Sequence, residues 1–123
     1  MARMITEKVT LICKERLLSL KADLLNRIKD NHRDFHSRDR GGDETDQAVD
    51  SLAEGQFLTI QDRLRGQLLE IEIALAKIER GIYGICEETE EPIEPERLLA
   101  IPWTRLSVEG AEIREDLSKR YAK

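Results

Sequence analysis

The sequence predicts an all-α protein, mainly a long antiparallel coiled-coil hairpin followed by a small globular head and a C-terminal helix. All three prolines, Pro92, Pro95 and Pro102, lie in the last third, so no proline interrupts a helix in the first 91 residues. Charged residues make up 37% of the chain and aromatic residues only 4%, which favours long exposed helices over a compact globule. Apolar residues also recur at helical spacing in two long segments.

The first of these segments predicts a helix over about residues 4 to 36. Its apolar stripe, at steps mostly of three and four, consists of Ile5, Val9, Ile12, Leu17, Leu20, Leu24 and Ile28. The second segment alternates steps of four and three, which indicates a coiled-coil seam. Its members are Leu64, Leu68, Ile71, Leu75, Ile78 and Ile82, extended backwards by Ala48, Leu52 and Ile60. Between the segments, Gly41-Gly42 can supply the tight reversal that antiparallel helices need.

The hairpin is therefore expected to span residues 1–82, with an acidic tip at about 37–47, and the head to span residues 83–123. After Gly81 the pattern changes to short pieces: a turn, an acidic loop, a proline-started turn of helix at "PERLLA", and a last helix near 104–121. The expected core of the head consists of Ile85, Ile93, Leu98, Ile101 and Trp103.

Charge and cysteine content narrow the class of function. The formal net charge is −5 with acids and bases interspersed, which argues against broad binding to a phosphate backbone and favours a protein partner. Two cysteines are too few for a disulfide framework, and no apolar run approaches the length of a membrane span. Without a basic-then-apolar leader, a cytoplasmic protein with reduced thiols and no membrane association is expected.

The segment "DETDQAVDSLAE", residues 43–54, contains five acids and no base. Helix capping is one full explanation, because Asp43 suits an N-cap and Asp46 the first turn of a helix. The functional interpretation starts from position. Asp43, Glu44 and Asp46 cluster at the expected tip of the hairpin, where exposed carboxylates can meet a cationic or metal-containing cavity of another protein.

At this point the chain resembles the DksA/TraR family of bacterial transcription factors. The family motif D-x-x-D-x-A at the hairpin tip corresponds to Asp43, Asp46 and Ala48. The head signature is also in register, at Gly81, Tyr83, Gly84, Cys86, Ile93, Arg97, Leu98, Ala100 and Pro102. The closing "AEIRE", residues 111–115, is similar to the family as well, so the resemblance covers nearly the whole chain.

The resemblance implies a non-enzymatic, monomeric regulator that does not read DNA sequence. Such factors insert the hairpin into the secondary channel of RNA polymerase and modulate initiation, often with guanosine tetraphosphate in the stringent response. Asp43 and Asp46 then become the effector acids, with Ala48 permitting close approach. Candidate contacts to the nucleotide or the channel rim are Arg63, Arg65 and Arg97. Nearby Glu70 and Glu72 would repel a polyphosphate, so a weaker dependence on the nucleotide is expected.

The zinc-finger-like head is expected to be degenerate and metal-free. The family's four cysteines correspond here to Cys86, Thr89, Ser107 and Gly110, whereas a structural zinc site needs four ligands, usually cysteine or histidine. Trp103, Leu106 and Val108 are expected to pack in compensation, giving a fold that survives chelation. The glutamates of residues 87–91 match no cation-binding loop, which favours a solvated surface over calcium or magnesium binding. These acids are expected to raise the pKa of the Cys86 thiol.

Two other functional classes remain open on the residues alone. A Gre-type transcript-cleavage factor has a similar acidic-tipped hairpin, but a larger head without the Gly-x-Tyr-Gly-x-Cys turn. A structural or oligomerising coiled coil would use the acidic tip only for capping. Among single residues, Cys13 is expected to be a small packing residue. His32 and His36 have the spacing of a two-histidine ligand pair, but no H-E-x-x-H context, so surface placement is favoured.

Overall fold

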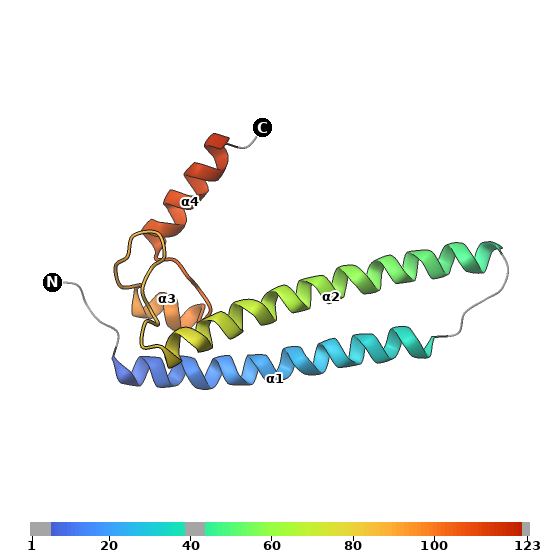
Figure 1. The fold of residues 1–123 in the computed structure, drawn as a ribbon, viewed down its shortest axis with the longest axis horizontal. Coiled ribbons are helices and arrows are strands. Elements are labelled where there is room, and N and C mark those ends of the chain that lie inside the picture. The colour runs from blue at the N-terminus through green and yellow to red at the C-terminus, as the bar shows by residue number, and fades with distance from the viewer. Residues whose placement is uncertain (1–5, 39–43, 122–123) are drawn as a thin grey trace. The chain divides into compact units, whose positions relative to one another are not determined.

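The computed structural model describes residues 6–38 and 44–121, with side chains from residue 47 onward in the second range. Four helices make up its regular structure (Figure 1): α1 Glu7–Ser37, α2 Glu44–Glu79, α3 Pro95–Ala100 and α4 Val108–Tyr121. In this described part the only β pairing is one isolated antiparallel bridge between Ile85 and Pro92. The all-α prediction is therefore confirmed. None of the helices in these ranges combines the length and apolar character of a membrane span.

Local sequence explains where α1 and α2 begin and end. The Thr6 hydroxyl accepts a hydrogen bond from the Val9 N–H at 3.2 Å, which caps the start of α1. After α2, the N–H of Ile82 bonds to the Lys77 carbonyl at 3.0 Å, and that of Gly81 bonds to Ile78 at 3.2 Å. With Gly81 at φ +74°, this is the Schellman arrangement, in which glycine adopts the left-handed conformation that other residues disfavour.

The chain divides into two compact units, one of residues 1–19 with 70–123 and one of residues 20–69. Inside the second unit, α1 and α2 pair in opposite directions. Three contacts define the pairing: the Gln61 side-chain amide donates to the Ile28 carbonyl at 3.2 Å, Phe35 stacks on Phe57 with ring centroids 4.4 Å apart, and Arg38 pairs with Asp50 at 2.7 Å. Partner numbers fall on one helix as they rise on the other, as an antiparallel hairpin requires.

The apolar stripes differ in detail from the prediction. On α1, Leu17 and Leu24 are buried as predicted, but the predicted Ile12 is 37% exposed and its neighbour Cys13 is buried instead. On α2, Leu64 and Ile71 are buried as predicted, but Leu52 is 64% exposed. Steps of three and four define a stripe without fixing which of two adjacent apolar residues faces the partner helix.

The unit of residues 1–19 and 70–123 contains the core of the head. Ile93 and Leu98 are buried as predicted, and the Cys13 thiol donates to the Leu98 carbonyl at 3.5 Å. Cys13 is thus a packing residue, as expected. The buried Tyr83 hydroxyl donates to the Pro102 carbonyl at 2.8 Å.

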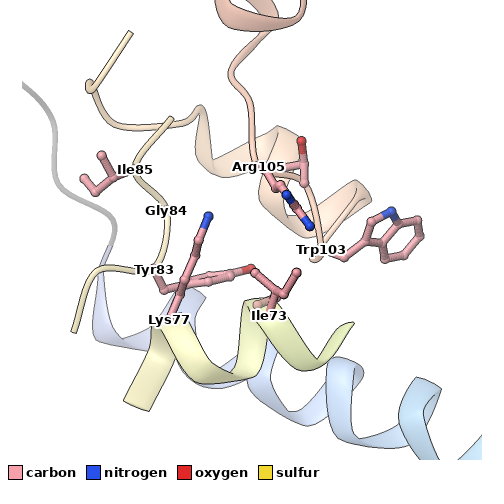
Figure 2. A pocket seen from close by; sticks show the side chains of 9 residues that line it. Ile73, Lys77, Tyr83, Gly84, Ile85, Trp103 and Arg105 are labelled. Atoms are coloured by element: carbon pink, nitrogen blue, oxygen red, sulfur yellow. The ribbon is translucent and has the colours of Figure 1, made fainter. Parts of the chain in front are cut away.

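Trp103 is not part of this core, contrary to the prediction. Its side chain is 38% exposed, and Figure 2 shows the indole pointing away from Tyr83 and Lys77. Val108, the first residue of α4, is 45% exposed and Leu106 is only half-buried. The expectation that Trp103, Leu106 and Val108 pack to compensate for lost metal ligands is therefore wrong, because two of these side chains face solvent.

Candidate functional site

The acidic motif predicted at the hairpin tip falls largely outside the described side chains. Asp43 lies outside the described residues, and Asp46 lies on α2 with its side chain outside the description. Ala48 is an exposed residue of α2. Asp50, a further acid of the same segment, is half-buried in its pair with Arg38. Asp50 therefore has an intramolecular partner, and the assignment of Asp43 and Asp46 as effector acids stays a prediction.

The four residues predicted to be degenerate metal-ligand positions lie together in the head. The Thr89 N–H donates to the Cys86 sulfur at 3.5 Å, and the Gly110 N–H donates to the Ser107 hydroxyl at 3.0 Å. Because Gly110 is the third residue of α4, Ser107 acts as the N-cap of this helix. A Cβ built on Gly110 would lie 2.4 Å from the Cys86 sulfur and 3.4 Å from the Ser107 hydroxyl. The Cys86 sulfur therefore fills the space that a side chain at residue 110 would occupy.

The environment of Cys86 favours a thiolate. Burial by itself raises the pKa of the thiol, but hydrogen bonds from the Ser107 and Thr89 hydroxyls and backbone N–H groups outweigh it and lower the pKa to about 6. Only 1% of the residue is exposed. The expectation that neighbouring acids raise this pKa is wrong, because donors in direct contact with the sulfur dominate over charges that have their own partners.

This donor set does not fit a four-cysteine zinc site. Cys86 offers one thiolate, Thr89 and Ser107 offer neutral hydroxyls, and Gly110 offers no side chain, whereas structural zinc is held by four cysteine or histidine ligands. Across the part of the chain that is described, no group of three or more His, Cys, Asp or Glu residues is arranged to hold a metal ion.

The carboxylate of Glu87 is surrounded by basic side chains from three elements. Lys77 of α2 lies 2.6 Å from it, Arg114 of α4 3.5 Å and Arg105 4.0 Å. The hydrogen bond from Lys77 lowers the pKa of Glu87, and the three positive charges add to this effect despite partial burial. Figure 2 shows Lys77 and Arg105 lining one small cleft of the head together with Tyr83. Glu87 is therefore an ion-paired residue of the head.

Two further ion pairs extend this network. Arg105 makes a bidentate pair with Glu70 of α2, at 2.9 and 2.7 Å, and Arg114 pairs with Glu88 at 2.9 Å. Glu87 and Glu88 thus lie at the surface, but as members of ion pairs that the expectation of a solvated acidic surface did not include. The bases lie far from these acids in sequence, so the acidic run alone gave no signal of the network. The ion-pair network therefore links α2, α4 and the loops of the head.

Of the three basic residues predicted to contact a nucleotide or the channel rim, two lie on α2 in the unit of residues 20–69 and the third lies in the other unit. Arg63 and Arg65 are exposed on α2, but residues two apart on a helix do not share a face. Arg97 lies in the other unit, and its guanidinium donates to the Leu106 carbonyl at 2.8 Å. Glu70, expected to repel a polyphosphate, is neutralised by Arg105. The roles of Arg63, Arg65 and Arg97 in contacting a nucleotide or the channel rim stay predictions.

Comparison with known proteins gives matches to both the head and the whole chain. Residues 81–116 match the family model of the prokaryotic dksA/traR C4-type zinc finger. The chain is 37% identical over 112 residues to the RNA polymerase-binding transcription factor DksA of Caulobacter vibrioides, covering 83% of this chain and 72% of that protein. The solved structure of transcription factor DksA2 from Pseudomonas aeruginosa matches with a TM-score of 0.82 and 31% identity, over 94% of this chain and 88% of the other. The structure of the RNA polymerase binding protein and transcriptional regulator Dks from Chlamydia trachomatis matches at 25% identity, with a TM-score of 0.51, over 93% of this chain and 94% of the other.

Proposed function

The chain belongs to the DksA/TraR family, and on that premise we propose that it is a transcription factor that binds bacterial RNA polymerase. The observation that carries the proposal is the similarity to a relative described as RNA polymerase-binding, which extends over 72% of that relative and includes both hairpin and head. A regulator of this kind has no catalytic activity of its own and works in the cytoplasm as a monomer, without reading DNA sequence.

In the proposed mechanism the hairpin enters the secondary channel of the polymerase. Asp43 and Asp46 then bring two carboxylates toward the cationic and metal-bearing centre, where they compete for positive groups and alter initiation complexes. The small side chain of Ala48, exposed on α2, permits close approach beside them. Nothing in this mechanism requires a bond to be made or broken by the factor itself.

We also propose that the head works without zinc. In place of a metal, the Cys86 sulfur takes hydrogen bonds from residues 89 and 107, and Glu87 pairs with bases of α2 and α4. Coupling to guanosine tetraphosphate is proposed to be weak. Arg63 and Arg65 lie on different faces of α2, and Arg97 donates to the Leu106 carbonyl.

The test uses purified RNA polymerase and initiation complexes at a stringently controlled ribosomal promoter. The full chain is expected to change the lifetime of these complexes and to compete with a Gre-type factor for the polymerase, with or without chelator. The variant D43N/D46N is expected to lose the effect on lifetime while still competing for binding.

A control removes a carboxylate charge from α2 outside the motif. Glu54 is exposed on α2, so Glu54→Gln is expected to behave as the unmodified chain. Wild-type activity in D43N/D46N would overturn the role of the two acids, and absence of competition would overturn the polymerase assignment. Release of short transcripts from backtracked complexes would instead identify a cleavage factor.

A further inference from the structure

Two histidines near the end of α1 lie together on the surface of the unit formed by residues 20–69. His32 and His36 are both exposed and occupy positions i and i+4, which neighbour each other on a helix. Their ring centroids are 4.1 Å apart. The two imidazoles therefore form a pair on one face, which the proposed role in transcription does not use.

Phe57 of α2 packs against the imidazole rings of His32 and His36. It meets His32 edge-on, with centroids 5.9 Å apart, and His36 in the same way at 6.0 Å. Phe57 is itself fixed by stacking on Phe35 at 4.4 Å. Edge-to-face contacts of this kind favour particular ring orientations, so the aromatic residues restrict the freedom of the two imidazoles before any ligand arrives.

We propose that His32 and His36 form a binding site for one divalent late transition-metal ion, copper, nickel or zinc, with water in the remaining coordination positions. Imidazole nitrogen is a preferred ligand of these ions. Two nitrogens bound to one ion at about 2.0–2.1 Å lie roughly 3 Å apart. Rings with centroids 4.1 Å apart are close enough for one nitrogen of each to bind the same ion. The ion would cross-link the last turns of α1.

The local charge permits a cation. Arg33, the base between the two histidines, pairs with Asp30 at 3.2 Å, so its charge is partly compensated. The site is also separate from the degenerate positions of the head, since Cys86 belongs to the other unit. Binding here is therefore independent of the polymerase assignment and of zinc in the head.

The test is calorimetric titration of the full chain with copper, nickel and zinc salts, each used separately. One saturable site per chain is expected, with copper bound more tightly than nickel or zinc, following the general order of divalent affinities. Changes to residues that merely support metal ligands lower affinity by about 10 to 100-fold, so H32N and H36N should each cost at least about tenfold. Both positions are exposed, and circular dichroism checks that the variants fold.

A matched control keeps two histidines but breaks their shared face. In H36N/S37H the pair lies at i and i+5, so affinity is expected to fall as in H36N, whereas C86S is expected to bind as the unmodified chain does. Selective broadening of the His32 and His36 imidazole resonances by nickel would support the site. Unchanged affinity in H36N/S37H, loss of binding in C86S, or no saturable binding to the unmodified chain would overturn it.

Discussion

The Cys86 sulfur and the backbone of Gly110 are packed so closely that a Cβ at residue 110 would lie 2.4 Å from the sulfur. This contact joins the loop after Tyr83 to the first turn of α4, at two positions predicted to correspond to zinc-binding cysteines of the family. Here the sulfur of one position fills the space of the other. Residue 110 is therefore required to be glycine, because the Cys86 sulfur occupies the space that a Cβ would need.

Gly110→Ala should destabilise the protein for this reason. Glycine to alanine within a helix normally adds up to about 1 kcal/mol of stability. Overpacking typically costs about 1 to 3 kcal/mol, so the clash should prevail and give a net loss of roughly 1 kcal/mol. The measurement is urea unfolding followed by circular dichroism.

Gly66→Ala is the matched control for this variant. Gly66 also lies in a helix, but a Cβ built on it meets nothing within 4 Å, so this substitution should stabilise. Equal effects of the two substitutions would contradict the steric account of Gly110.

Stability should depend on pH through Cys86. A pKa of about 6 in the folded protein is below the ordinary thiol value near 8.5, so the folded state favours the thiolate. The stabilisation is fully present above the unfolded pKa and is lost as pH falls toward the folded value. Stability should therefore rise from about pH 6 to about pH 8.5, and Cys86→Ser should remove this slope.

Ser107→Ala tests the origin of that shift. The variant loses a hydrogen-bond donor to the sulfur and the N-cap of α4, which should raise the pKa of Cys86 and cost about 0.5 to 2 kcal/mol of stability. Ultraviolet absorbance of the thiolate during a pH titration reports the first effect, and urea unfolding reports the second. A thiol that titrates unchanged in this variant would contradict the assigned role of Ser107.

The regular parts of this fold could be predicted because their signals are local. Two stripes of helical spacing and the position of Gly81 predicted the hairpin helices and the end of α2, which the structure places at Glu79. It was harder to predict which residues of each stripe are buried. Ile12 and Cys13 are apolar neighbours, and the buried one is Cys13, which contacts the distant Leu98 carbonyl.

The chemistry of the head was harder to predict, because it depends on residues distant in sequence. Glu87 and Arg114 are 27 positions apart, so the acidic run around Glu87 appeared unpaired. The pKa of Cys86 was predicted in the wrong direction because nearby charges were counted, whereas Ser107 and Thr89 supply the donors that decide it. Composition cannot show which polar groups meet.

The ion-pair network can be tested by removing the charge of Glu87. Glu87→Gln leaves Lys77 without its 2.6 Å partner and should destabilise by about 1 kcal/mol at low salt, less at high salt, since these pairs are partly exposed. Because the pKa of Glu87 is lowered on folding, its contribution is present above its ordinary pKa and disappears as pH falls below it. Exposed Glu91 provides the control Glu91→Gln, which should change stability little. Equal losses in both variants at neutral pH would argue against the network.

The behaviour of the head under chelation follows from its donor set. With one thiolate among the four former ligand positions, EDTA should leave the helical content and the thermal midpoint unchanged. The triple variant T89C/S107C/G110C is the positive control, because it places thiols at all four positions. Its Cβ at residue 110 requires the Cys86 sulfur to move, so the variant should fold only when zinc draws the four sulfurs around one ion. Because metal binding then contributes folding free energy, EDTA should lower its thermal midpoint. Loss of structure in the unmodified chain on adding EDTA would show that a metal holds this head, and would overturn the hydrogen-bonded role of Cys86.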